Sequence, residues 1–221
     1  MGRNFSNCFR CNNDFRKFSS TAANKPSKVT GIFFNISTGF IIAPLAVSGI
    51  TGNYQDGIFA SVTYLIIYAF MNIGAFLSVH LFTNFTKSDN FYEWGGIAKH
   101  SPLAGVLTTV FFFSLAGIPP LGGWFAKFVV FRSLLSTGEI IGISLAILGA
   151  INAVIALVYY ARISKVIWMD ELKNSEEEKS FEFQSPLKVV GALTVLITFV
   201  AGIFPGIFSY LGEVSSIFFG N

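Results

Sequence analysis

Five long runs of apolar residues constrain what this chain can fold into more than any other feature of its sequence. A helix needs about 20 apolar residues to cross a hydrocarbon core of about 30 Å. We therefore expect five transmembrane helices, at about 29–50, 57–82, 102–135, 138–168 and 186–211. Only 12% of the residues are charged, whereas soluble domains carry about 25%. Because no alternating, strand-like pattern recurs, the sequence predicts an all-α integral membrane protein.

The distribution of basic residues predicts how these helices are oriented. If the chain crosses a membrane five times, all but two of its 15 lysines and arginines fall on one side. The exceptions are Arg132, at the opposite face, and Lys127, inside the third apolar run. Basic residues gather on the cytoplasmic side of a bacterial membrane and on the matrix side of a mitochondrial one. We therefore expect the N-terminus on that side and the tail at 212–221 on the other.

The first 28 residues form a basic stretch, rich in serine and asparagine, before the first apolar run. They lack the apolar core of a secretory signal and resemble a mitochondrial transit peptide, which is rich in Arg and Ser and poor in acids. We interpret residues 1–28 as a presequence or, where it is not removed, as an arm on the matrix side of the membrane.

Cys8 and Cys11 form a single Cys-x-x-Cys pair within this stretch. Structural zinc sites use four ligands, and the sequence has no second cysteine pair, so we expect two unliganded thiols. A metal shared with another subunit and a disulfide remain alternatives. No other pattern indicates a redox centre or a nucleotide site. We expect neither a metal nor a cofactor in this chain, and no binding of nucleic acid.

The third apolar run contains a pattern that should interrupt its helix, in the stretch FFFSLAGIPPLGGWFAKFVVF. Pro119 and Pro120 remove helix donors and clash with the preceding turn. Gly117, Gly122 and Gly123 give the backbone freedom around them. We therefore predict a helix broken at Gly-Ile-Pro-Pro. Because unsatisfied backbone is costly in lipid, such a break must be covered by protein or water, and broken helices near the midplane form the ion sites of many transporters.

Lys127 follows this break and is the main candidate for a functional residue. A lysine at the bilayer centre costs about 3 kcal/mol even on insertion scales. Burial also disfavours the charged form of a lysine, so we interpret Lys127 as a group that takes up and releases protons. Two other interpretations stay open. The side chain could reach toward a membrane interface, or its ammonium could be tied to a structural carboxylate.

Four further polar residues could extend a path for protons. Tyr68 and Asn72 are four residues apart and share a helix face. Thr108 precedes the break, and His100 lies at the mouth of the third apolar run. For each of these residues, helix packing, interfacial anchoring or capping of a loop remains the alternative role.

The motif SLAGIPPLGGWFAKFVVF, at 114–131, resembles a family of membrane proteins. The family is that of the antiporter-like subunit N of respiratory complex I, called NADH dehydrogenase subunit 2 in mitochondria. The segments at 68–79 and 159–168 resemble the helices that flank this motif, and the resemblance extends over about 29–211. One departure is Thr38, where the family commonly has a histidine. We therefore do not extend the proton-relay role of that histidine to the first helix of this chain.

The resemblance implies a proton-translocating membrane-arm subunit of NADH:ubiquinone oxidoreductase, an enzyme whose redox centres lie in other subunits. Lys127 matches the lysine of the family's second broken helix and would be the proton-transfer residue. The chain resembles only the last helices of family members. We therefore expect the C-terminal half of a split subunit in the mitochondrial inner membrane, with the N-terminus in the matrix and the C-terminus in the intermembrane space.

The expected partners are a separate N-terminal half of the subunit, other membrane-arm subunits of complex I, and membrane lipids. Two alternatives of a different kind stay open. One is a structural membrane-arm subunit that does not pump. The other is a related subunit of a cation/proton antiporter or of a membrane-bound hydrogenase.

Overall fold

The computed structural model describes residues 26–88, 90–171 and 185–219, and the regular elements in these residues are all helices. The expected N-terminal arm up to residue 25, with Cys8 and Cys11, lies outside the described residues. The long helices are α2 (Pro26–Thr51), α3 (Tyr54–Thr86), α5 (Pro102–Ala116), α6 (Gly122–Ser136), α7 (Ile140–Met169), α8 (Ser185–Ile203) and α9 (Gly206–Phe219). Two short helices, η1 (Phe91–Trp94) and α4 (Ile97–His100), connect α3 to α5.

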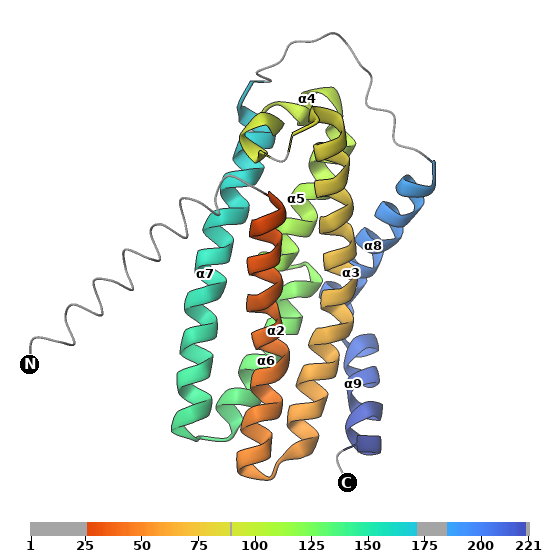
Figure 1. Cartoon of the computed structure of the whole chain (residues 1–221). Helices are drawn as coiled ribbons and strands as arrows, with labels where there is room; N and C mark the ends of the chain where they lie inside the picture. Colours follow the sequence, from red (N-terminus) through yellow and green to blue (C-terminus); the bar gives the residue numbers. More distant parts are fainter. Residues whose placement is uncertain (1–25, 89, 172–184, 220–221) are drawn as a thin grey trace, which may run out of the picture.

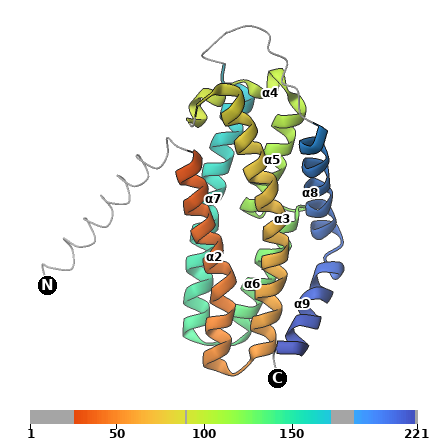
Figure 2. The ribbon, with the colours of Figure 1, turned by 45° about the vertical axis from the view of Figure 1, so that its right-hand side comes forward.

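The helices run side by side along one long axis, with α3 at the centre of the bundle (Figure 1). Helix α3 contacts α2, α5, α6, α8 and α9. Helices α5 and α6 follow one another along the axis, so that together they fill the space between α3 and α7 (Figure 2). The chain leaves the α-helical conformation over residues 117–121 between them. This interruption therefore lies midway along the bundle and is surrounded by other helices.

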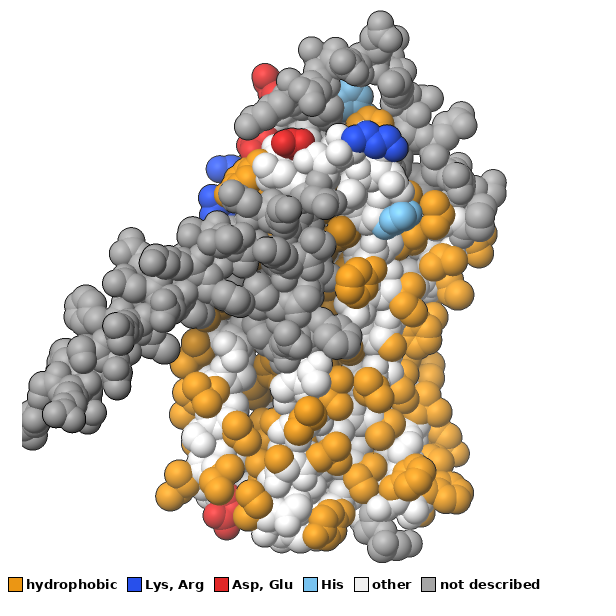
Figure 3. Space-filling view, in the orientation of Figure 1, with side chains coloured by type: hydrophobic (Ala, Val, Ile, Leu, Met, Phe, Trp, Pro, Cys, Tyr) orange, Lys and Arg blue, Asp and Glu red, His pale blue; other side chains and the backbone are white. Residues whose placement is uncertain are grey.

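On the face of the bundle that Figure 3 shows, hydrophobic side chains lie along the whole length and charged side chains lie near the two ends (Figure 3). In the described part of the chain, α3 and α7 are each long and apolar enough to cross a membrane, and α8 with α9 would make a third span if the bent pair counts as one. Helix α7 exposes large side chains such as Ile140 and Val158, at 82% and 65% of their surface. Such side chains on the outside of a bundle are expected where lipid is the solvent.

The structure corrects the expectation of one continuous helix at 186–211 followed by a tail at 212–221. Helix α8 ends at Ile203 and α9 begins at Gly206, and the two are bent by 82°. Pro205 explains the bend, because proline has no N–H and its ring clashes with the preceding turn. The Phe204 amide still bonds to the Val200 carbonyl at 2.8 Å, which ends α8. Helix α9 then continues to Phe219, so most of the expected tail is helical.

Glycines allow α8 and α6 to approach the interruption closely. A Cβ atom added to Gly202 of α8 would overlap the carbonyl oxygen of Pro120. The indole N–H of Trp124 in α6 donates to the Gly202 carbonyl at 3.2 Å. Small residues commonly let membrane helices pack at short distance. Gly202 therefore fixes how α8 covers the 117–121 segment.

We expect Gly202→Ala to destabilise the protein by about 1–3 kcal/mol, the usual cost of overpacking a well-packed contact. The matched control is Gly39→Ala in α2, where an added Cβ meets no atom within 4 Å. That change should be neutral or stabilise by about 0.5–1 kcal/mol, because alanine favours helix. Thermal unfolding in detergent measures both. Equal unfolding temperatures for the two variants would show that α8 does not pack here as described.

Candidate functional site

The end of α5 is closed by its own backbone. Gly117 adopts the left-handed conformation, with φ 93° and ψ 33°. Its amide donates to the Ser114 carbonyl at 2.9 Å, and the Ile118 amide donates to the Phe113 carbonyl at 3.0 Å. This is the Schellman arrangement of a helix C-terminus. It satisfies two of the four carbonyl groups that a helix leaves without a partner at its end.

The other two carbonyl groups at the end of α5 accept hydrogen bonds from Lys127. The Nζ atom lies 2.8 Å from the Leu115 oxygen and 2.7 Å from the Ala116 oxygen. The side chain is only 8% exposed, so it faces protein and not the surface of the bundle. A helix C-terminus carries a partial negative charge and favours a cation. The lysine is therefore held by main-chain dipoles, and these acceptors are not carboxylates.

Two other residues shape the space around the ammonium group. The Lys127 Nζ atom lies 5.8 Å from the centre of the Phe40 ring of α2, within the range of a cation–π contact. A Cβ atom added to Gly117 would lie 3.0 Å from Lys127 Cδ. A glycine is therefore required at position 117 for two reasons. It allows the left-handed backbone conformation, and it leaves space for the Lys127 side chain.

Ser114 connects the start of α6 to the rest of the site. Its hydroxyl accepts a hydrogen bond from the Gly123 amide at 3.2 Å and donates to Met71 Sδ of α3 at 2.7 Å. Ser114 is fully buried. Leu121, at the N-cap of α6, makes no side-chain cap, so Ser114 supplies an acceptor that α6 lacks. Ser114 was not among the predicted site residues, although a serine within an apolar run just before the break is a signal of a polar role.

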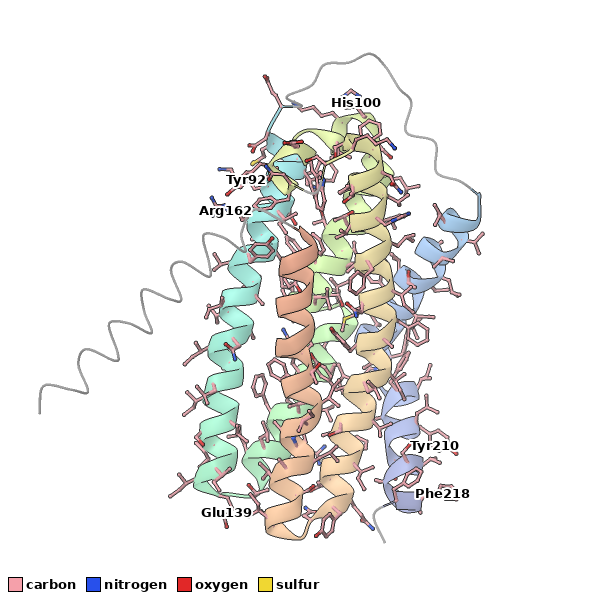
Figure 4. The ribbon with its side chains drawn as sticks, in the orientation of Figure 1. Tyr92, His100, Glu139, Arg162, Tyr210 and Phe218 are labelled. Atoms are coloured by element: carbon pink, nitrogen blue, oxygen red, sulfur yellow. The ribbon has the colours of Figure 1, made fainter. Side chains whose placement is uncertain are left out.

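Two of the predicted accessory residues do not lie beside Lys127. Thr108 is buried and its hydroxyl donates to the Ala104 carbonyl of its own helix at 2.8 Å. His100 ends α4 and is exposed at the far end of the bundle (Figure 4). Helix α5, with 15 residues, separates His100 from Ala116 by about 22 Å at 1.5 Å per residue. Neither side chain therefore contacts the ammonium.

Tyr68 and Asn72 share one face of α3, as their spacing predicted. Both line an open groove of ≈ 640 Å³ along α3 that is bounded by Val190 of α8. Tyr68 also reaches the inside of the bundle, where its ring stacks on Tyr64 at 5.8 Å between centres. The Ser37 side chain is a hydrogen-bond partner of both tyrosines. Tyr68 therefore has contacts both with the groove and with the interior.

An aromatic row joins Lys127 to this groove. The Phe40 ring that faces the Lys127 ammonium stacks on Tyr64 at 5.7 Å, and Tyr64 in turn stacks on Tyr68. The row of Phe40, Tyr64 and Tyr68 runs across α2 and α3. Sequence reasoning missed Phe40 and Tyr64, because nothing in their local spacing shows that they meet a lysine from a third helix.

The described residues contain no group of three His, Cys, Asp or Glu side chains placed to hold a metal ion. The site is therefore built from one ammonium, main-chain carbonyls, a serine hydroxyl and tyrosine hydroxyls. Such a set can bind, hold and transfer a proton.

We expect Ser114→Ala to lower the free energy of unfolding by about 1–3 kcal/mol, because the buried Gly123 amide would lose its acceptor. Ser144→Ala in α7 is the matched control, since the Ser144 hydroxyl is exposed and bonds only within its own helix. Thermal unfolding in detergent measures the difference. A Ser114→Ala variant as stable as the control would mean that Ser114 does not cap α6.

The chain is similar to known proteins over most of its length. Residues 38–156, which include Lys127, match the family model described as NADH:quinone oxidoreductase/Mrp antiporter, TM. The chain is 37% identical over 177 residues to NADH-quinone oxidoreductase subunit N 2 of Rhizobium meliloti (strain 1021), an alignment that covers 79% of this chain and 35% of that protein. A second relative, NADH-quinone oxidoreductase subunit N of Moorella thermoacetica, is 34% identical over 149 residues, covering 67% of this chain and 30% of that protein. The chain thus spans about a third of the length of the curated relatives it matches.

The fold is also found in solved structures. One chain of the Mrp complex from Dietzia sp. DQ12-45-1b matches with a TM-score of 0.72 at 17% identity, covering 90% of this chain and 43% of that one. At this identity the likeness shows the fold alone.

Proposed function

The chain belongs to the NADH:quinone oxidoreductase/Mrp antiporter membrane family, and from this premise we propose that it is a proton-translocating membrane-arm subunit of NADH:ubiquinone oxidoreductase. The observation that carries the proposal is the buried Lys127 ammonium, bound by two carbonyl groups where α5 ends. Curated relatives of the chain are subunits N of NADH-quinone oxidoreductases. In the proposal, oxidation of NADH and reduction of the quinone take place in other subunits, and this chain holds no redox cofactor.

We infer that α5 and α6 together form one membrane span, interrupted at residues 117–121. Each of the two helices has 15 residues and is about 22 Å long, which is too short for a hydrocarbon core of about 30 Å. Placed end to end, α5 and α6 are long enough to cross the hydrocarbon core, and the interruption between them lies near the middle of the core. With α2, α3, α7 and the bent pair α8–α9, this gives five spans. It also places Lys127 at the depth where transporters of this kind bind ions.

The hydrogen bonds of Lys127 suit both states of a proton carrier. An ammonium has three N–H donors, and two of them are bound to Leu115 and Ala116. A neutral amine keeps two N–H groups and gains a lone pair. Lys127 could therefore release its third proton without breaking either hydrogen bond. A positive charge arriving nearby would favour that release, because like charges disfavour the ammonium.

The proposal requires further helices, because the chain spans about a third of the length of its curated relatives. We propose that the remaining part of subunit N, as a separate chain, docks against this bundle beside other membrane-arm subunits and lipid. The membrane proposed is the mitochondrial inner membrane, with the N-terminus in the matrix and the C-terminus in the intermembrane space. The end of the bundle that bears His100 and Arg162 would face the matrix (Figure 4).

We expect Lys127→Ala to leave the complex assembled and to lower both proton pumping and the quinone reduction that is coupled to it. Lys127→Arg should impair pumping as well, because a guanidinium can donate to both carbonyls but does not release a proton. Lys99→Ala removes the same charge at an exposed position of α4 and is the control. Proton-to-electron ratios in vesicles that contain the assembled complex measure the effect. If Lys127→Arg kept a normal ratio at a normal turnover rate, Lys127 would not carry the proton.

The family description also covers Mrp antiporters, which makes a cation/proton antiporter subunit the second candidate. The two differ in their partners. We expect the chain to migrate, after solubilisation in digitonin, with a complex that oxidises NADH. A complex that contains the chain, lacks NADH dehydrogenase activity and exchanges Na⁺ for protons after reconstitution would favour the antiporter instead.

A further inference from the structure

A polar cavity lies at the end of the bundle opposite to His100, where α3 begins and where α6 and α9 end (Figure 1). Its volume is ≈ 410 Å³, a size typical of sites that bind small molecules. Three charged side chains line it: Asp56 of α3, Arg132 of α6 and Glu213 of α9. The proposed function gives none of them a role. The cavity is therefore a charged site that remains to be explained.

The three charged side chains of the cavity do not neutralise one another. In the part of the chain that the structure describes, no ion pair joins Arg132 to either carboxylate. The Asp56 carboxylate accepts a hydrogen bond from the Asn53 side-chain amide at 2.7 Å, and the N-terminus of α3 favours its negative charge. The charges come from three different helices, which hold them apart around the cavity. The space between them is thus bounded by one cation and two anions.

Serine hydroxyls of the lining add hydrogen-bond acceptors to the cavity. The Ser209 hydroxyl donates to the Gly206 main-chain carbonyl at 3.0 Å, and the Ser216 hydroxyl donates to the Glu213 main-chain carbonyl at 2.8 Å. A hydroxyl has one proton and two lone pairs, so these two oxygens accept any further hydrogen bond. The cavity therefore suits a ligand that carries several N–H donors together with one anionic group.

The cavity lies at the level where lipid headgroups are expected. Helix α7 has 30 residues and is about 45 Å long, which matches the thickness of a bilayer with its headgroups. Glu139 precedes α7 at the same end of the bundle (Figure 4). Phe59 and Val129 also line the cavity, about one helical turn deeper than Asp56 and Arg132. The cavity is thus polar at headgroup level and becomes apolar toward the hydrocarbon.

Helix α9 separates the cavity from an apolar surface. Ser209, Glu213 and Ser216 follow the spacing of one helix face, and all three line the cavity. Outside this face, Tyr210 and Phe218 are exposed at 64% and 78% (Figure 4). A soluble protein buries the apolar part of such a helix. Lipid is therefore the expected neighbour of α9, at a distance of one helix from the cavity.

We propose that this cavity binds a zwitterionic lipid headgroup with a primary ammonium, that of phosphatidylethanolamine. The Arg132 guanidinium binds the phosphate, since arginine forms paired hydrogen bonds with phosphate oxygens. The Asp56 and Glu213 carboxylates and the serine oxygens accept the three N–H groups of the ammonium. Binding rests on the membrane position proposed above for this end of the bundle, and proton transfer by Lys127 plays no part in it.

The lining favours this headgroup over those of other phospholipids. A choline headgroup has no N–H donor, and proteins bind quaternary ammonium groups within several aromatic rings. Among the described residues of the lining, Phe59 is the only aromatic one. Phosphatidylglycerol would bring a phosphate without an ammonium to one guanidinium and two carboxylates. Its headgroup would be repelled, because the site carries one more negative than positive charge.

Photo-crosslinking in the intact complex tests the site. The probe is phosphatidylethanolamine with a diazirine near the glycerol end of one acyl chain, in vesicles of phosphatidylcholine. Mass spectrometry should find the label on the α6 and α9 peptides that contain Val129 and Ser209. For a preference of about tenfold, half of this label is lost when unlabelled phosphatidylethanolamine makes up about a tenth of the lipid. Phosphatidylglycerol and water-soluble glycerophosphoethanolamine should not displace the probe.

Three results of this experiment would overturn the site. Label that avoids the α6 and α9 peptides would show that the cavity holds no lipid. Equal displacement by phosphatidylglycerol, or no displacement by phosphatidylethanolamine beyond dilution, would show that the lining does not select the headgroup. Displacement by glycerophosphoethanolamine at millimolar concentration would assign the cavity to a soluble molecule in place of a lipid.

Two variants separate the phosphate contact from the ammonium contact. Arg132→Gln should weaken labelling by phosphatidylethanolamine and phosphatidylcholine probes alike. Glu213→Gln should leave the choline probe unaffected and reduce the preference for ethanolamine from about tenfold to about threefold, because Asp56 remains. A structural role alone would not change this preference. Glu139→Gln, which removes an exposed carboxylate outside the cavity, is the control. If Glu213→Gln and the control keep the same preference, Glu213 does not bind the ammonium and the proposal fails.

These results are separable from the proposed function. Lys127→Ala should be labelled like the unchanged complex, because the lysine does not line the cavity. Impaired pumping by Lys127→Arg, together with no headgroup preference, would keep the proton carrier and overturn the lipid site. Normal pumping by Lys127→Arg, together with selective labelling, would remove the carrier and keep the lipid site.

Discussion

The structure of the site depends on the two hydrogen bonds between the Lys127 ammonium and the carbonyls that end α5. An interrupted helix leaves carbonyl groups that lipid cannot satisfy. The turn at Gly117 satisfies two of them through the Gly117 and Ile118 amides, and Lys127 satisfies the remaining pair. The dependence is mutual, because a buried ammonium also needs acceptors. A helix end supplies them without a second full charge, and its dipole is worth about 1 kcal/mol or somewhat more. A positive charge that arrives nearby can outweigh a stabilisation of this size, because like charges disfavour the ammonium.

Close backbone contacts hold these groups in place. Added Cβ atoms at Gly123 and Gly202 would overlap the carbonyls of Ser114 and Pro120. The start of α6 therefore lies against the end of α5, and α8 covers the segment between them. Without these close contacts, the Lys127 side chain could not extend past the N-terminus of α6 to the Leu115 carbonyl of α5. The glycines of the motif thus act through packing as well as through backbone freedom.

The sequence predicted those parts of the fold that depend on local chemistry. The resemblance to the antiporter-like subunit N, the helical membrane fold and the burial of Lys127 follow from apolar runs, the motif and the cost of charge in lipid. The bend between α8 and α9 was missed although Pro205 and Gly206 are the same kind of signal as Gly-Ile-Pro-Pro, because the length of the run suited one span. His100 lies at the mouth of the third apolar run, as the sequence predicted, and the length of α5 separates it from Lys127. Contacts between distant segments, such as Phe40 with Lys127, have no local signal.

The surroundings of Lys127 are mostly apolar. The row of Phe40, Tyr64 and Tyr68 leads from the ammonium to the groove that Tyr68 lines. Ile67 and Val130 belong to the same buried cluster as this row, and its two tyrosines are the polar side chains of that cluster. A single lysine that met water on both sides at once would short-circuit the membrane. A carrier must therefore be reached from one side while the other is closed. In the proposed function, opening of this cluster toward one side at a time would be the step that gives the proton transfer its direction.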